Sequence, residues 1–82
     1  MFSVKNVKKN VTGNDVLLLA EILRARGLYK GKLEPNLKCS ATLVKSINKY
    51  QDMRREQGVE LGVNGKSDGI CGPKMWKDIL GL

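Results

Sequence analysis

Few side chains in this sequence of 82 residues have the chemistry of a nucleophile or a metal ligand. There are two cysteines, Cys39 and Cys71, and no histidine. Imidazole acid–base catalysis is therefore excluded, and two thiolates are too few for a four-cysteine zinc site. Three interpretations of the cysteines stay open: two buried thiols that act as small hydrophobic groups, a disulfide, or a reactive pair. We expect no metal or other cofactor.

Carboxylates offer a second route to catalysis. Glu34, Glu60 and Asp68 are the candidates for a paired acid and base of the kind that glycosidases use. All three lie in stretches where turns or solvated loops need polar residues, and nothing in the sequence fixes their separation. We therefore expect a protein that is not an enzyme.

The most informative stretch of the chain is residues 68–81, which combines a turn, a helix start and an apolar helix face. Asp68 and Gly69 form a turn dipeptide, and Pro73 suits the first turn of a helix, where its missing N–H costs nothing. The apolar residues that follow recur at helical spacing: Met75, Trp76, Ile79 and Leu80. This pattern predicts a helix over 73–80 that ends at Gly81.

Two earlier helices are predicted by similar signals. A cluster of capping residues at 12–15 precedes an apolar helical pattern that ends at Gly27, and Ser40 precedes a second pattern that ends at Gly58. Three short helices joined by glycine-rich turns predict a compact all-α three-helix bundle over residues 12–82. The lysine-rich residues 1–11 are expected to form a basic arm or linker, with at most one short extended stretch.

A weak internal repeat accompanies this pattern. An offset of 32 residues aligns three pairs of identical residues: Cys39 with Cys71, Lys45 with Lys77, and Ile47 with Ile79. Two turn-plus-helix units of this kind would bury together what neither could bury alone.

The charge of the chain predicts attraction to polyanions. The formal net charge is +7 and the pI is about 9.7, which suits nucleic acid or an anionic cell-surface polymer. Part of this charge surrounds one turn: Arg24, Arg26, Lys30 and Lys32. No apolar run is long enough for a membrane span, and the first residues lack the apolar region of a signal peptide.

Several motifs together resemble the peptidoglycan-binding domain of the three-helix type, which is attached to bacterial and phage cell-wall hydrolases such as endolysins and amidases. The resemblance covers residues 13–80 and is carried by Gly13-Asn14-Asp15-Val16, Gly27-Leu28-Tyr29-Lys30-Gly31, Tyr50-Gln51, Val63-Asn64-Gly65, and Asp68-Gly69-Ile70-Cys71-Gly72 with Trp76. The chain departs from the family pattern at Ala20, Asn36-Leu37, Ser40, Leu43 and Met75.

The resemblance implies a non-catalytic module that binds peptidoglycan and targets a cell-wall hydrolase domain in the same chain or in another. It implies a place at the cell wall or outside the cell, with export or release not encoded in this segment. The candidate ligand-binding residues are Tyr29, Tyr50, Gln51, Asn64, Asp68 and Trp76. These residues have structural alternatives, because Tyr50 and Trp76 lie on predicted helix faces and Asn64 and Asp68 suit turns. The alternative function is a small basic helical domain that binds nucleic acid. The expected burial of Trp76 and Ile79 argues against it, because these residues would not be presented to a groove.

Overall fold

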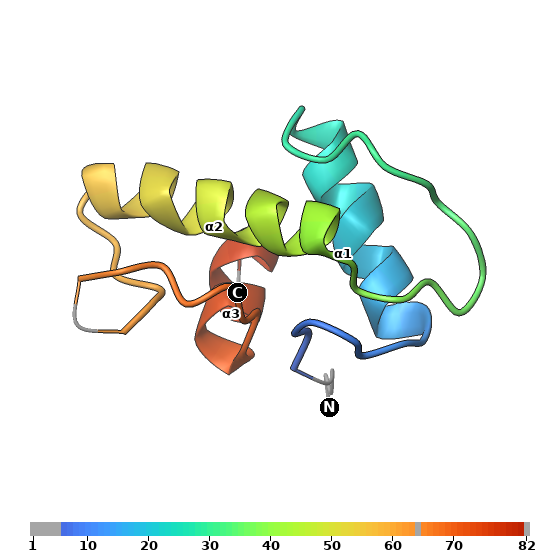
Figure 1. Ribbon diagram of the computed structural model, residues 1–82. Coiled ribbons are helices and arrows are strands. Elements are labelled where there is room, and N and C mark those ends of the chain that lie inside the picture. Colours follow the sequence, from blue (N-terminus) through green and yellow to red (C-terminus); the bar gives the residue numbers. More distant parts are fainter. Residues whose placement is uncertain (1–5, 64, 82) are drawn as a thin grey trace.

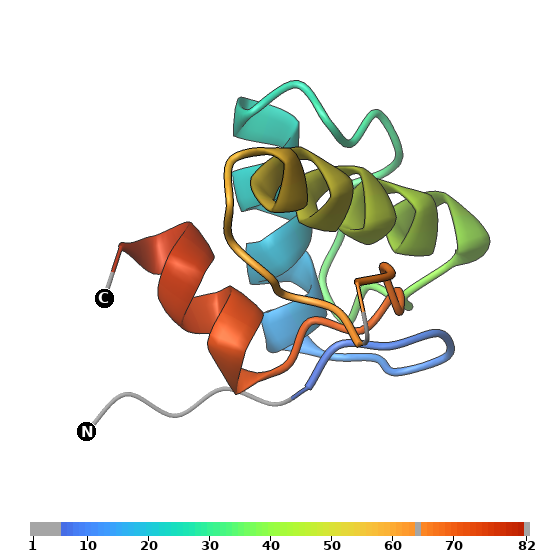
Figure 2. The ribbon, with the colours of Figure 1, turned by 90° about the vertical axis from the view of Figure 1, so that its left-hand side faces the viewer.

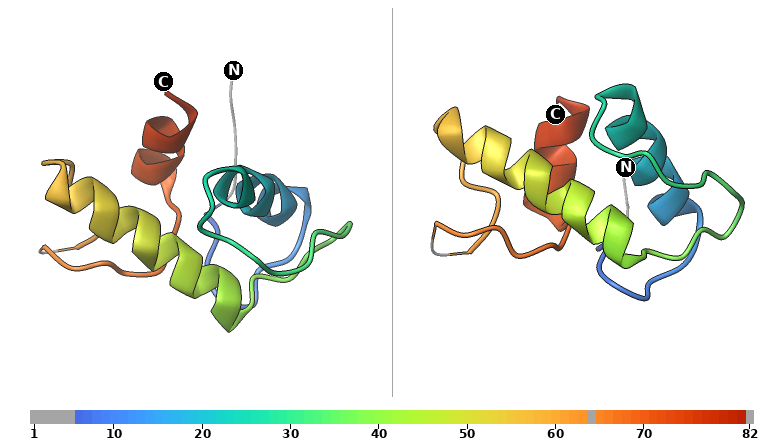
Figure 3. Two further views of the ribbon diagram at one scale, coloured as in Figure 1. Left: turned by 90° about the horizontal axis from the view of Figure 1, so that it is seen from above. Right: turned by 45° about the horizontal axis from the view of Figure 1, so that its top comes forward.

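Three helices make up the regular structure of the residues that the structure describes. The computed structural model describes residues 6–63 and 65–81, with α1 over Asn14–Ala25, α2 over Ala41–Glu56 and α3 over Pro73–Leu80 (Figure 1). α1 and α3 lie on the same side of α2 (Figure 3). The described residues form no strand, only three isolated backbone bridges. The predicted all-α fold of three helices is confirmed.

Glycines end α1 and α2 in the same way. Gly27 has a φ of 77°, its N–H donates to the Arg24 carbonyl at 3.0 Å, and the N–H of Leu28 donates to the Leu23 carbonyl at 2.9 Å. These two bonds form a Schellman motif, which satisfies carbonyls that the helix leaves unpaired. α2 ends with the same pair of bonds around Gly58, whose φ is 90°. The chain therefore turns sharply at the positions that the glycines predict.

One hydrophobic core fills the space between the helices. Every buried position predicted on α3 is confirmed except Leu80, which is half-buried. The core includes all three aromatic side chains that the structure describes, each at most 4% exposed: Tyr29, Tyr50 and Trp76. These rings therefore stabilise the packing of the helices and present no face to solvent.

The segment before α1 packs against the helices. Val7 is fully buried and exchanges two backbone hydrogen bonds with Cys71, at 3.0 and 2.8 Å. A few residues later, the N–H of Cys39 donates to the Val11 carbonyl at 2.8 Å, and the Cys39 carbonyl accepts the N–H of Asn10 at 2.9 Å. Figure 2 shows this segment passing beneath α1. The boundary predicted at residue 11 thus falls inside the packed region, because the backbone of residues 7, 10 and 11 is hydrogen-bonded to residues 71 and 39.

The two cysteines occupy equivalent places in the fold. Each lies two positions before a helix, ahead of Ala41 in α2 and of Pro73 in α3, and each is paired with the N-terminal segment. This arrangement agrees with the 32-residue offset seen in the sequence. Both cysteines are free, buried thiols in the structure, which matches the first of the three interpretations.

Candidate functional site

Gln51, a predicted ligand-binding residue, has a structural role. Its side chain is fully buried in α2, and its Nε2 donates to Asp68 Oδ1 at 2.9 Å and to the Ile70 carbonyl at 3.0 Å. Its Oε1 accepts the N–H groups of Asp68 and Gly69, at 3.1 and 3.3 Å. The Gln51 amide thus hydrogen-bonds to both the N–H donors and the oxygen acceptors of the turn that precedes α3. Its hydrogen-bonding groups are used within the fold, and none of it is open to a ligand.

Tyr50 is likewise engaged inside the molecule. Its hydroxyl donates to Asp78 Oδ2 at 2.6 Å, and the same carboxylate receives two hydrogen bonds from Arg54, at 2.9 and 3.0 Å. The guanidinium of Arg26 lies over the Tyr50 ring, 5.6 Å from its centre, and its Nη2 donates to the Ile79 carbonyl at 3.3 Å. This cluster connects the C-terminal ends of α1 and α3 to α2.

The electrostatics of this cluster follow from its hydrogen bonds. Burial and the hydrogen bond to Asp78 raise the pKa of Tyr50 to about 12. Burial opposes ionisation of Asp78, but the hydrogen bonds from Arg54 and Tyr50 outweigh it and hold the pKa of Asp78 below its ordinary value. The cluster is therefore an ion pair with a neutral phenol beside it, and it stabilises the fold.

The other predicted residues do not come together in one site. Tyr29 is buried and its hydroxyl donates to the Lys32 carbonyl at 2.8 Å, while Trp76 is 1% exposed in the core. Asp68 is exposed, but its Oδ1 also accepts the N–H of Ile70 at 3.0 Å, as a turn-forming aspartate does. Asn64 lies outside the described residues.

The carboxylates considered for catalysis also have separate roles. Glu60 Oε1 accepts the N–H of Gly62 at 2.9 Å, and Asp68 holds its own turn. Glu34 lies in the loop between α1 and α2. Within residues 6–63 and 65–81, no group of three or more His, Cys, Asp or Glu side chains is arranged to hold a metal ion.

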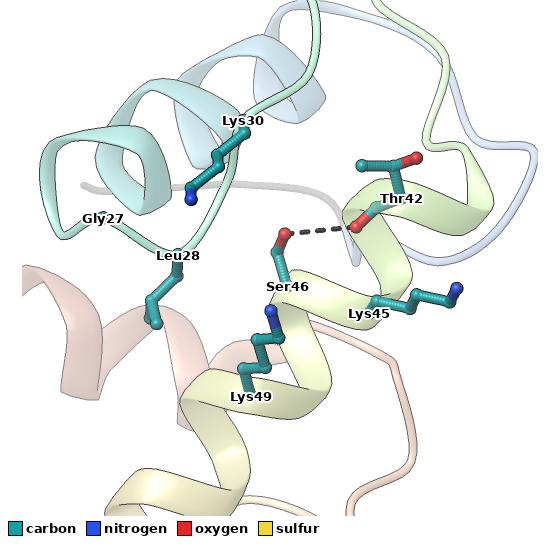
Figure 4. A pocket seen from close by; sticks show the side chains of 7 residues that line it. All are labelled: Gly27, Leu28, Lys30, Thr42, Lys45, Ser46 and Lys49. Atoms are coloured by element: carbon teal, nitrogen blue, oxygen red, sulfur yellow. Dashed lines mark hydrogen bonds between the residues drawn. The ribbon is translucent and has the colours of Figure 1, made fainter.

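An open groove lies elsewhere, between the end of α1 and the first half of α2. It has a volume of about 330 Å³ and is lined by Gly27, Leu28, Lys30, Thr42, Lys45, Ser46 and Lys49 (Figure 4). We call it the lysine groove. The left-handed turn at Gly27 redirects the chain after α1, and Leu28 and Lys30 of the following loop line the groove together with residues of α2.

The lysine groove has the chemistry of an anion-binding site. Figure 4 shows the Lys49 side chain rising into the space beside Ser46, whereas Lys30 extends along its own loop toward Leu28 and Lys45 points away. Ser46 Oγ donates to the Thr42 carbonyl at 3.1 Å. None of the lining residues is acidic, so the ammonium groups have no compensating charge within the groove. The arrangement can take a small anion or one charged end of a larger ligand.

Sequence reasoning missed this groove. The signal was partly present, because residues 42, 45, 46 and 49 share one face of a helix by their spacing. That spacing alone indicates an ordinary solvated surface, because it does not show that Leu28 and Lys30 line the same groove. A second hollow of about 310 Å³ adjoins the groove at Thr42, and its lining includes Lys32, Glu34 and Lys38.

No protein-family model, curated protein or solved structure matches this chain. The resemblance to peptidoglycan-binding domains thus depends on the motif residues themselves. Among the helices that the structure describes, none has the length and apolar character needed to cross a membrane.

Proposed function

We propose that this chain is a non-catalytic module that binds bacterial cell-wall peptidoglycan and brings a cell-wall hydrolase, such as a phage endolysin, to its substrate. The hydrolase domain belongs to the same chain or to a separate partner, and the module acts at the cell wall, outside the cell. The lysine groove is its ligand site. This proposal replaces the six residues predicted from the sequence with the groove between α1 and α2.

The observation that carries the proposal is the groove together with the roles of the motif residues. Gln51, Asp68 and Gly69 fix the turn before α3, and Gly27 ends α1 and shapes the groove. These motif residues, which resemble the peptidoglycan-binding family, therefore stabilise turns of the fold. The groove that the fold leaves open is lined by one apolar side chain, Leu28, together with residues that carry hydroxyl or ammonium groups. The hollow is shallow and polar, unlike the enclosed and mostly apolar pockets that hold small-molecule cofactors, and it suits one part of a polymer.

The test is a pull-down of the purified chain with insoluble sacculi from which secondary polymers have been removed. Carboxymethyl-cellulose is the matched anionic control and chitin the matched neutral glycan. We expect the chain to pellet with sacculi in the presence of excess duplex DNA and to pellet less with either control. Equal retention on sacculi and carboxymethyl-cellulose, or release by DNA, would overturn the proposal.

Nucleic-acid binding is the competing function, and the net charge of +7 is the observation in its favour. Met75, Trp76 and Ile79 are buried, however, so this face of α3 is not available to enter a groove of DNA. Phosphate contacts would make DNA affinity fall steeply with salt. A DNA affinity in the nanomolar range at 150 mM salt, with such a slope, would favour this competing function.

A further inference from the structure

The turn before α1 carries a sequence pattern that the proposed function does not use. Asn10-Val11-Thr12 has asparagine, a residue other than proline, and threonine in succession, which is the acceptor pattern for N-linked glycans. No other asparagine in the sequence has serine or threonine two positions later. So short a pattern also arises by chance, and its meaning depends on where the fold places it.

The fold places this pattern at the surface. Asn10 and Thr12 are exposed, although Val7, three residues before Asn10, is fully buried. The N–H of Val11 donates to the Lys8 carbonyl at 3.1 Å and closes the turn, in which Asn10 has a φ of 77°. Figure 2 shows this turn, in blue, at the lower edge of the molecule. The folded chain therefore leaves room for a large group on the Asn10 side chain.

The backbone of the same residues is paired in the folded chain. The N–H of Asn10 donates to the Cys39 carbonyl at 2.9 Å, and Thr12 forms a backbone bridge with Lys38. An enzyme that holds the acceptor residues in its own site needs them free of such partners. During synthesis Asn10 precedes residues 38 and 39, so it stays unpaired until they have followed. The nascent chain thus offers the acceptor in a form that the folded chain does not.

We propose that Asn10 is the acceptor of an N-linked glycan, attached to the unfolded chain in a compartment that contains an oligosaccharyltransferase. The co-reactant is an oligosaccharide linked to a lipid diphosphate. A bond forms between Asn10 Nδ2 and C1 of the first sugar while the bond from C1 to the diphosphate breaks. The lipid diphosphate leaves with the electron pair of that bond, and the amide loses one proton. This inference does not depend on the proposed function.

The closing experiment translates the full chain behind a cleavable secretion leader in the presence of microsomes, which supply the transferase and the lipid-linked donor. We expect a loss of gel mobility by one glycan, reversed by peptide N-glycosidase and absent from both Asn10→Gln and Thr12→Ala. Asn6→Gln changes an exposed asparagine outside the pattern and should be glycosylated as the parent chain is. The folded, purified chain should stay unmodified when it is added to detergent-opened microsomes.

A further variant keeps a negative result informative. In the Asn10→Gln background, Lys38→Thr places a threonine two positions after Asn36, which is exposed in the loop between α1 and α2. Glycosylation of this variant but not of the parent chain would overturn the proposal, as would a glycan that persists in Asn10→Gln.

Thermal unfolding tests the fit of the glycan to the fold. The glycosylated chain should melt at the temperature of the unmodified chain or above it, because Asn10 is exposed. A clearly lower midpoint would show that the folded turn has no room for the glycan. Equal glycosylation of the folded and the nascent chain would contradict attachment before folding.

Discussion

Gln51 Nε2 donates to Oδ1 of Asp68 at 2.9 Å, while Gln51 Oε1 accepts the backbone N–H of the same aspartate at 3.1 Å. The two residues are far apart in the sequence, and this pair of bonds fixes the turn before α3 against the middle of α2. The turn is thus held by one buried amide, which makes that amide the first place to test the fold.

Replacing Gln51 with Ala should destabilise the protein by about 3 kcal/mol, because it leaves the N–H groups of Asp68 and Gly69 and the Ile70 carbonyl without their partner. Urea denaturation measures the change. Gln57→Ala, at an exposed position just after α2, is the matched control and should cost less than about 0.5 kcal/mol. Similar losses in the two variants would contradict the role of Gln51.

The Asp78 cluster predicts a dependence of stability on pH. The pKa of Asp78 is held below its ordinary value by Arg54 and Tyr50 against the effect of burial, so its stabilising effect is fully present above the unfolded pKa of about 4 and is lost as the pH falls through the folded pKa. Asp78→Asn should lower stability at pH 7 by about 1 to 2 kcal/mol and flatten the acid side of the profile. Urea midpoints from pH 7 to pH 2 test this. An unchanged acid slope in Asp78→Asn would assign the acid sensitivity to other carboxylates.

The thiols should be unreactive in the folded protein. Burial raises the pKa of Cys39, and burial together with the neighbouring Cys39 and Asp68 raises the pKa of Cys71 to about 12, so little thiolate is present at pH 8. A disulfide-exchange reagent at pH 8 should label neither cysteine until urea unfolds the chain, and should then label both. Rapid labelling of the native protein would favour a reactive pair, and no labelling after unfolding would favour a disulfide.

Val7→Ala should cost about 2 kcal/mol, because it removes methyl groups from a fully buried site. Lys8→Ala, at the exposed neighbouring position, should have little effect. Thermal unfolding of the two variants decides between a packed segment and a detached arm. Equal midpoints for both would mean that residue 7 contributes nothing to the core.

Gly69 and Gly58 make a matched pair for backbone strain. Both have a positive φ, of 70° and 90°, so an alanine at either position should cost about 1 kcal/mol. At Gly69 the added Cβ would also lie 2.9 Å from Val44 Cγ1, whereas nothing lies within 4 Å at Gly58. Gly69→Ala should therefore be the more destabilising of the two in urea, and the reverse order would contradict the close contact with Val44.

The helices were predictable because their signals are local. Gly27 and Gly58 adopt positive φ values that other residues avoid, and Pro73 suits only the start of a helix. These residues determine the chain direction without help from distant parts, so the bounds of α3 were predicted to the residue.

The site was not predictable because it depends on tertiary packing. Spacing places Lys45 and Lys49 on one face of α2, but only the folded loop after α1 makes Leu28 and Lys30 part of the same groove. The aromatic and amide residues were predicted to bind a ligand because of their side-chain types. In the structure Gln51 and Tyr50 are buried and make hydrogen bonds within the fold instead. In the same way, the sequence allowed one short extended stretch before α1 but did not indicate that Val7 pairs with Cys71.

The pairing of Val7 with Cys71 has a consequence for synthesis on the ribosome. All of α1 and α2 lies between these residues, so Val7 stays without its backbone partner until residue 71 has left the exit tunnel. Until then the nascent chain exposes apolar side chains that the finished molecule conceals. The domain therefore completes its fold in one late step, and a translational pause before α3 prolongs the interval in which a chaperone or protease can reach those side chains.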